Sequence, residues 1–200
     1  GEILKGPVLE LPEQAILHRF HEGRGYIYYS FPFFNKPLLT VSDDHIYFVN
    51  SSQFKINVYN RDGTPLREIE HSIDKVPTTL NELIQLYEKM DMSRLDYYTG
   101  ENAAVRMIQD ADNLPNFWPA LNNILVDDEN RIWASTFVED FDMYEWWVLD
   151  NTGELISRFD WPRSKPIETV KKGFMYTLET NPESGLQQVV RYRIEFGEGR

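Results

Sequence analysis

The fold is decided by a stretch that begins Asp43-Asp44-His45-Ile46-Tyr47-Phe48-Val49, continues Ile56-Asn57-Val58-Tyr59-Asn60-Arg61-Asp62-Gly63 and ends Leu66-Arg67-Glu68-Ile69. It reads as a turn, a strand, a loop, a second strand, a tight turn and a third strand, and Leu38-Leu39-Thr40-Val41 supplies a further strand before it. Asp-Gly between two alternating strands is a strong hairpin signal. The stretch therefore predicts a four-stranded antiparallel unit over about residues 37–71.

The same pattern returns twice further along the chain. The second copy covers about residues 119–160, and the third covers about 166–197 without an obvious outer strand. A repeat of short antiparallel strands, about 40 residues long, is typical of a β-propeller blade. We therefore predict an all-β, propeller-like fold in which residues 1–200 form a single partial propeller domain of about three four-stranded blades.

A helical insertion is expected over about residues 77–117, between the first two blades. Thr79 and Glu82 have the spacing of a capping box. A second helix is expected over about 101–111, where apolar residues again cluster. In the first helix the apolar side chains recur at i, i+3, i+4, i+7 and i+10, as they do on one helix face: Leu80, Leu83, Ile84, Tyr87 and Met90.

The N-terminal part carries weaker signals. Residues 3–11 look like a strand without a preceding partner, and the aromatic run at 26–31 suits a strand with both faces partly covered. The chain begins with Gly1 rather than Met. We infer that a leader, a tag or a longer N-terminal portion has been removed, and a removed leader would favour a periplasmic or extracellular location.

Composition limits the classes of partner. The net charge of −12 repels phosphate backbones, so nucleic acid is not an expected partner. No apolar run approaches the roughly 20 residues that span a bilayer, so we expect no membrane insertion. The absence of cysteine excludes disulfides, thiol nucleophiles and cysteine zinc sites.

Parts of the chain resemble a known family. The stretches that carry the resemblance are Leu66–Ile69 through Val76–Thr79, the helix that follows, and Pro119–Leu121 with Val126–Trp133. They resemble the bacterial proteins described as six-bladed β-propellers, which place a helical insertion between two blades and follow it with an innermost hairpin of the form P-x-x…V-D-x-x-G-x-I/L-W-V. Asn130 stands where the family often has Gly, and Ala134 where it often has Val.

The resemblance covers most of residues 37–197. It implies a six-bladed ring but says little about activity, because most such members have no assigned reaction. A closed propeller typically has 4–8 blades, more than the three found here. We therefore expect either the C-terminal half of a longer propeller or self-association of two copies through open blade edges.

Acidic and aromatic clusters suggest two kinds of site. Asp43-Asp44 and Asp127-Asp128-Glu129 could bind calcium, but they lie at strand-to-strand turns, where Asp favours the tight geometry by itself. We interpret them as turns. The adjacent Trp146 and Trp147 must point to opposite faces of a strand, so we interpret the tryptophans as packing between blades rather than as a carbohydrate platform.

Propeller geometry places the insertion 77–117, the long loop 137–143 and the loop 181–185 on one face, opposite the tight turns. Insertions in repeat proteins tend to collect on the binding face, although the aromatic residues of the 137–143 loop could simply cover the blade. We expect alanine changes there to abolish ligand binding without lowering stability. The predicted ligand-binding residues are Trp118, Phe137, Glu139, Asp140 and Asp142.

No catalytic or metal-ligand signature is present: the sequence lacks G-x-S-x-G, a P-loop and H-E-x-x-H. The sequence therefore favours a non-enzymatic binding module for an unknown protein or small-molecule ligand. The alternative is a calcium-dependent propeller hydrolase or lactonase whose acidic side chains converge on the central channel. A structural half-propeller that assembles with a partner is a third possibility.

Overall fold

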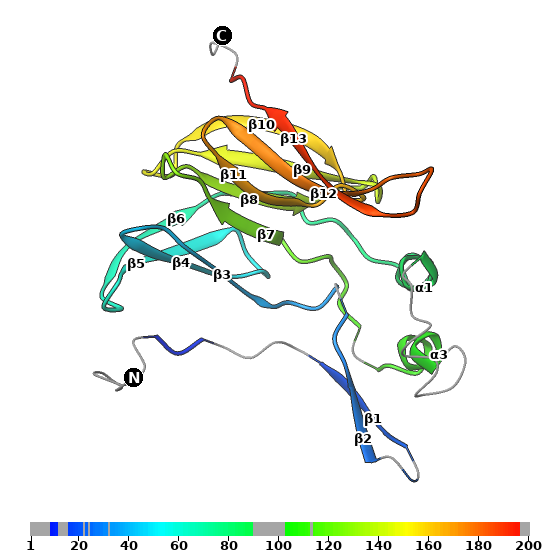
Figure 1. Ribbon diagram of the computed structural model, residues 1–200. Helices are drawn as coiled ribbons and strands as arrows, with labels where there is room; N and C mark the ends of the chain where they lie inside the picture. The colour runs from blue at the N-terminus through cyan, green and yellow to red at the C-terminus, as the bar shows by residue number, and fades with distance from the viewer. Residues whose placement is uncertain are drawn as a thin grey trace.

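Three antiparallel sheets make up most of the protein in the computed structural model (Figure 1). The structure describes residues 9–11, 16–21, 23, 25–31, 33–89, 103–112 and 114–196. Within these residues the fold is all-β apart from two helices, as the sequence predicts at this coarse level. None of the helices among them has the length and apolar character needed to cross a membrane.

The first sheet has four strands in the order β3-β4-β5-β6, each paired with its successor in the chain. Its boundaries match the unit predicted over 37–71. The Asp62-Gly63 hairpin is present, with Gly63 at φ 86°, a backbone conformation that glycine adopts without steric cost. The strands are β3 (Pro37–Val41), β4 (His45–Asn50), β5 (Lys55–Asn60) and β6 (Pro65–Glu70).

The second and third sheets follow the same sequential order. The third has three strands in the described part of the chain rather than four, as the missing outer-strand pattern indicated. The second sheet consists of β7 (Leu121–Val126), β8 (Ile132–Phe137), β9 (Met143–Leu149) and β10 (Leu155–Pro162). The third consists of β11 (Ile167–Lys171), β12 (Phe174–Thr180) and β13 (Gln187–Arg193).

The second sheet packs between the other two. Trp147 points into the core shared with the first sheet, and its neighbour Trp146 points into the core shared with the third. This confirms that the two tryptophans lie on opposite faces. Every residue of β8 is buried, because both of its faces are covered.

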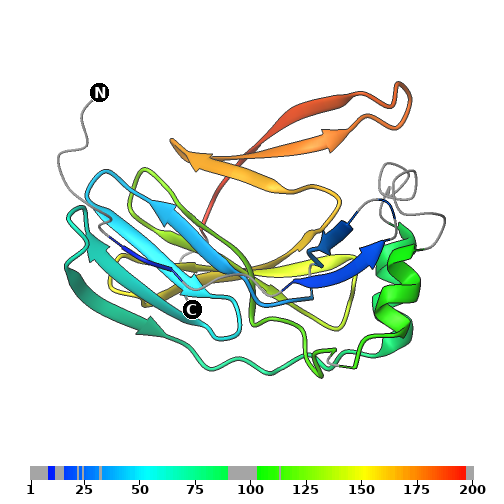
Figure 2. The same ribbon diagram turned by 90° about the horizontal axis from the view of Figure 1, so that it is seen from below.

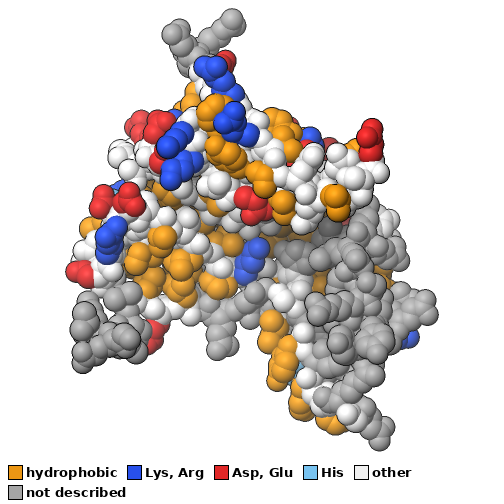
Figure 3. Space-filling view, viewed as in Figure 1, with side chains coloured by type: hydrophobic (Ala, Val, Ile, Leu, Met, Phe, Trp, Pro, Cys, Tyr) orange, Lys and Arg blue, Asp and Glu red, His pale blue; other side chains and the backbone are white. Residues whose placement is uncertain are grey.

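The sheets fan out from their first strands (Figure 2). β7 contacts both β3 and β11, so the first strands of all three sheets lie together. The flanks of the stack stay open: Leu39 and Val41 on the first sheet are 53% and 62% exposed, and Figure 3 shows hydrophobic side chains gathered over β3–β5.

The helices of the insertion are α1 (Leu80–Lys89) and α3 (Ala103–Gln109), and they contact each other. The predicted capping box is present: the Thr79 N–H donates to a Glu82 carboxylate oxygen over 2.8 Å, and the Glu82 N–H donates to Thr79 Oγ1 over 3.3 Å. Met90 and residues 101–102, assigned to helices from the sequence, lie outside the described residues. The helices cover an aromatic cluster through Leu83 and Ile108.

The N-terminal region contains a two-stranded hairpin of β1 (Leu17–His21) and β2 (Gly25–Tyr29). β2 begins and ends slightly earlier than the predicted strand at 26–31. β1 was not predicted, because its sequence, LHRFH, lacks a clear alternation of apolar and polar residues. Of the strand expected at 3–11, residues 3–8 lie outside the described part and residues 9–11 are not in a strand.

Candidate functional site

The two ends of the sheet stack differ in structure. The turn face carries the tight turns at 42–45, 60–64, 127–131 and 150–154. The loop face carries the connector 71–76, which follows the first sheet, and the loop 138–142 between β8 and β9. The predicted ligand-binding residues all belong to the loop face or its immediate surroundings.

A cavity of about 780 Å³ opens on the loop face. The connector forms one wall, the end of β8 and the 138–142 loop form a second, and β9 with β10 forms the third. This arrangement brings three of the five predicted residues to one cavity: Phe137, Glu139 and Asp140. Trp118 instead lines an adjoining cavity of about 240 Å³, and Asp142 does not line either one.

Five carboxylates line the 780 Å³ cavity, against a single arginine, Arg158. Two of the five stabilise the protein itself: Asp140 Oδ1 accepts from the Asp142 N–H over 2.9 Å, and a Glu145 oxygen accepts from Trp147 Nε1 over 2.6 Å. The other three have no hydrogen bond or ion pair with the described residues, and they come from separate walls: Asp74, Glu139 and Asp160.

Trp147 forms the apolar floor of the cavity. It is 8% exposed and packs edge-on against Phe54, with 5.3 Å between ring centroids. The Arg158 guanidinium lies 4.8 Å from the Trp147 ring centroid and 3.8 Å from Glu145. The cation of Arg158 is therefore engaged by the wall, which leaves the free charges of the cavity negative.

Trp118 and Phe137 are core residues rather than an exposed platform. They are 3% and 5% exposed, and their rings stack with centroids 4.9 Å apart. Phe141 and Phe33 close the cluster around Trp118. This burial is at odds with the expectation that alanine at either position leaves stability unchanged, because each truncation would open a hole in a packed cluster.

Arg163 fixes the 138–142 loop. Its Nε donates to Met143 O over 2.8 Å, and its backbone N–H donates to Asp142 O over 2.9 Å. Burial lowers the pKa of its guanidinium, while Tyr144, Asp140 and Asp142 act in the opposite direction, and an arginine stays charged in any case. The guanidinium packs over three rings at 4.4–5.4 Å: Phe137, Phe141 and Tyr144.

On the turn face, the carboxylate of Asp127 is bound by its own turn, whereas that of Asp128 accepts from the Lys172 N–H of another turn over 3.0 and 3.1 Å. Asp127 is 4% exposed, and its two oxygens accept from the backbone N–H groups of Glu129 and Arg131, from Arg131 Nε and from Trp133 Nε1, over 2.7–3.0 Å. This confirms the interpretation of the acidic turn as local geometry. Asn130 has φ 60°, a left-handed backbone conformation that Asn adopts more readily than most non-glycine residues.

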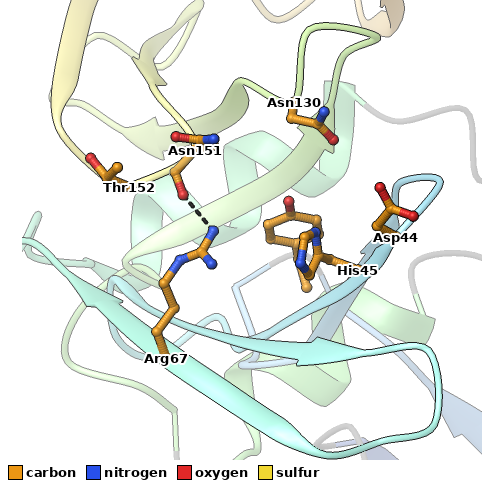
Figure 4. A pocket seen from close by; sticks show the side chains of 7 residues that line it. Asp44, His45, Arg67, Asn130, Asn151 and Thr152 are labelled. Carbon is orange, nitrogen blue, oxygen red and sulfur yellow. Dashed lines mark hydrogen bonds between the residues drawn. The ribbon is translucent and has the colours of Figure 1, made fainter.

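A second cavity, of about 270 Å³, lies on the turn face between the first two sheets (Figure 4). Arg67 reaches across it and donates from Nη2 to the carbonyl of Asn151. Asp44 and His45 line the opposite side. Among the described residues, no group bonds to the buried Tyr47 hydroxyl or to Arg67 Nε. The cavity is small, and the hydrogen bond from Arg67 to Asn151 across it links the first two sheets.

Further cavity residues, not among the predicted ones, lie on β9 and β10, and the register of these two strands is the sequence signal that identifies four of them: Glu145, Trp147, Arg158 and Asp160. Alignment of the two strands through the turn at 150–154 pairs Glu145 with Asp160 and Trp147 with Arg158. Directly paired residues share one face of a sheet, so this register places two carboxylates, an arginine and a tryptophan together. The connector residue Asp74 has no comparable signal, since its position depends on the path of the chain.

No family model matches the chain, and no curated protein matches it.

Proposed function

We propose that this chain is part of a β-propeller related to the bacterial six-bladed proteins that it resembles. The proposal is supported by three sequentially ordered antiparallel sheets whose first strands lie together. It is also supported by the helical insertion between the first and second sheets and by the positive φ at Asn130.

The proposed function is that of a binding module that takes an extended cationic ligand, such as a basic peptide segment, in the loop-face cavity. The observation that carries this proposal is the set of three carboxylates, Asp74, Glu139 and Asp160, that face the 780 Å³ cavity without partners among the described residues. All three carboxylates are exposed, so water screens their mutual repulsion, and a bound cation gains a modest attraction from each of them.

The carboxylates lie on separate walls rather than at one point. Among the described residues no group of three His, Asp or Glu side chains is placed to hold a metal ion. A ligand whose positive charges are spread along its length suits such a distribution, with its aliphatic stems against the Trp147 and Phe137 side of the cavity.

Binding of a fluorescein-labelled tetralysine peptide, measured by fluorescence anisotropy, tests the proposal. The variant carrying Asp74→Asn, Glu139→Gln and Asp160→Asn removes the three free charges. Exposed ion pairs contribute roughly 0.2–1 kcal/mol each, so we expect the triple variant to bind roughly 30-fold more weakly. The interaction should also weaken with added salt, because exposed charges are screened.

A control variant removes the same net charge elsewhere. Asp43→Asn, Glu154→Gln and Glu183→Gln neutralise three exposed carboxylates that do not line the cavity. This control should bind tetralysine nearly as well as the unmodified chain, and a tetraglutamate peptide should not bind. Equal weakening by both triple variants would mean that tetralysine responds only to overall charge, and the proposal would fail.

The calcium-dependent hydrolase or lactonase alternative stays a prediction with a test of its own. A ligand that binds only the folded state raises the melting temperature, and the rise grows with the ligand concentration relative to Kd. A calcium-specific rise in melting temperature that magnesium does not reproduce would favour that alternative over the binding module.

A further inference from the structure

The outer faces of the first and third sheets are not covered by another sheet in the described part of the chain. Leu39 and Val41 on the first are exposed, whereas Phe48 beside them is 9% exposed. Residues paired directly across strands share a face. On the first sheet the outer face carries Leu39 paired with Phe48, and Val41 paired with Ile46. The opposite face of the same sheet belongs to the core shared with the second sheet.

The acidic side chains on this outer face come from β6. The register pairs Glu68 with Asn57, which itself pairs with Phe48, and it pairs Glu70 with Lys55. Lys55 Nζ binds Glu68 over 2.8 Å. The first flank is therefore an apolar patch beside two glutamates and one lysine, with a net negative charge.

The third sheet presents an outer face of the opposite charge. Phe174 is paired with both Lys171 and Arg193, and Tyr176 is paired with Arg191. Val189, paired with Leu178, is 71% exposed. Arg191 lies over the Phe174 ring at 4.4 Å, and Figure 3 shows Lys and Arg side chains gathered near the C-terminal end of β13.

We propose that the basic flank of the third sheet in one copy packs against the acidic flank of the first sheet in a second copy. Arg193 pairs with Glu195 over 3.2 Å, so the face carries two cations, Lys171 and Arg191, beyond that pair. In a chain of net charge −12, such a basic face with an apolar centre is best neutralised by an acidic, apolar surface. The first sheet of another copy provides that surface. Electrostatic complementarity of this kind fixes the register of association and rejects wrong pairings.

The geometry favours closure by two copies. Each copy offers one flank of each charge, so a head-to-tail contact made twice uses all four flanks. Two sets of three sheets then form a ring of six, within the 4–8 sheets of closed propellers. The contact is between faces, unlike an edge contact, in which the free strand β13 would add to another sheet by backbone hydrogen bonds.

Sedimentation of the 200-residue chain and two charge-reversed variants tests the proposal. The basic-flank variant carries Arg191→Glu and Arg193→Glu, and the acidic-flank variant carries Glu68→Arg and Glu70→Arg. Every changed residue lies on an outer face, so each variant should fold, which circular dichroism and thermal melting check. Like charges then face each other in both contacts, and we expect the dimer dissociation constant to rise roughly 100-fold or more.

The decisive measurement mixes the two variants in equal amounts. In one contact of the mixed pair, the acidic side chains introduced on β13 face the basic side chains introduced on β6, and the other contact keeps its original charges. We expect the mixture to form dimers although neither variant does so alone. A second readout tests the apolar part of the contact: Leu39→Glu with Val41→Glu should also give monomers.

Several results would overturn the proposal. These are an unmodified chain that stays monomeric at all concentrations, a charge-reversed variant that still dimerises, a mixture that stays monomeric, or species larger than a dimer. A dimer insensitive to Glu68→Arg and Glu70→Arg would point instead to pairing through the β13 edge.

Discussion

The turn face and the loop face use the same residue types for different purposes. On the turn face, Asp127 is buried and its oxygens accept four hydrogen bonds. On the loop face, Glu139 and Asp160 border a cavity with no partner in the described chain. Acidic residues that look alike in sequence therefore differ in their hydrogen bonds. A carboxylate whose oxygens all accept hydrogen bonds from the protein stabilises the fold, whereas a carboxylate without such partners is available to a ligand.

The largest effect is expected where the hydrogen-bonded carboxylate of Asp127 is removed. Asp127→Ala breaks the ion pair with the mostly buried Arg131, which keeps Glu129 at 3.0 Å, and leaves the Trp133 N–H without its acceptor. Breaking a buried ion pair costs about 3–5 kcal/mol, so the free energy of unfolding, measured with urea, should fall by that amount. Asp43→Ala on the same face is the control, and a loss below about 1 kcal/mol for Asp127→Ala would contradict the comparison.

A smaller loss is expected inside the loop face. Trp118→Ala empties part of the aromatic cluster, and we expect a cost of about 3 kcal/mol, at the lower end for such truncations because the site borders a cavity that can collapse. Urea unfolding measures this cost. Glu139→Gln should leave stability within about 0.5 kcal/mol. Similar losses of unfolding free energy for both variants would mean that the loop face is not divided into buried residues such as Trp118 and exposed residues such as Glu139 that do not affect stability.

The backbone conformation of the turns can be tested by replacing their glycines with alanine. Gly153 has φ 99°, and a Cβ there would lie 2.6 Å from Ile69 Cγ2, so Gly153→Ala should cost about 2 kcal/mol from backbone and steric strain. Gly173, at φ 73°, has open space around it. Gly173→Ala should therefore cost only about 1 kcal/mol. The difference in melting temperature between the two variants measures the steric contribution of Ile69. Equal decreases in melting temperature would show that the contact with Ile69 is unimportant.

The smallest effect concerns pH. The hydroxyl of Thr152 and the N–H groups of residues 152–154 lower the pKa of Asp150 in the folded state. A lowered folded pKa adds stability above the unfolded pKa, about 3.9, which is lost as pH falls through the folded value. Asp150→Asn keeps the turn, as Asn60 does in the first sheet, but removes this contribution.

The difference in melting temperature between the unmodified chain and Asp150→Asn should therefore shrink as the solution is acidified below about pH 4. A difference that stays constant with pH would assign the loss to turn geometry rather than to charge.

Much of the sheet structure could be predicted from sequence because its signals are local. The Asp62-Gly63 hairpin and the repeated turns place the strands of the first sheet, and the missing outer-strand pattern after residue 194 anticipates the three-stranded third sheet. The alternation of Trp146 and Trp147 also follows from strand geometry alone.

The candidate site was harder to predict because it depends on long-range packing. Phe137, Glu139 and Asp140 could be placed at the cavity from loop length. Sequence could not show that Trp118 would be buried in a cluster with Phe33 and Phe137, or that the connector would bring Asp74 to the cavity of Glu139. Asp142 was grouped with its neighbours by proximity, although its backbone carbonyl instead binds Arg163.

The complete burial of β8 has a consequence for how the protein opens. Residues 132–135 cannot reach water by local fraying, since the first and third sheets cover both faces and β7 and β9 occupy both edges. Thr136 and Phe137, at the end of the strand, border the loop-face cavity instead. Amide protons in this strand should consequently exchange with deuterium only when the whole stack of sheets comes apart. The central strand thus reports global unfolding, while the outer strands β6 and β13 report local opening of the flanks.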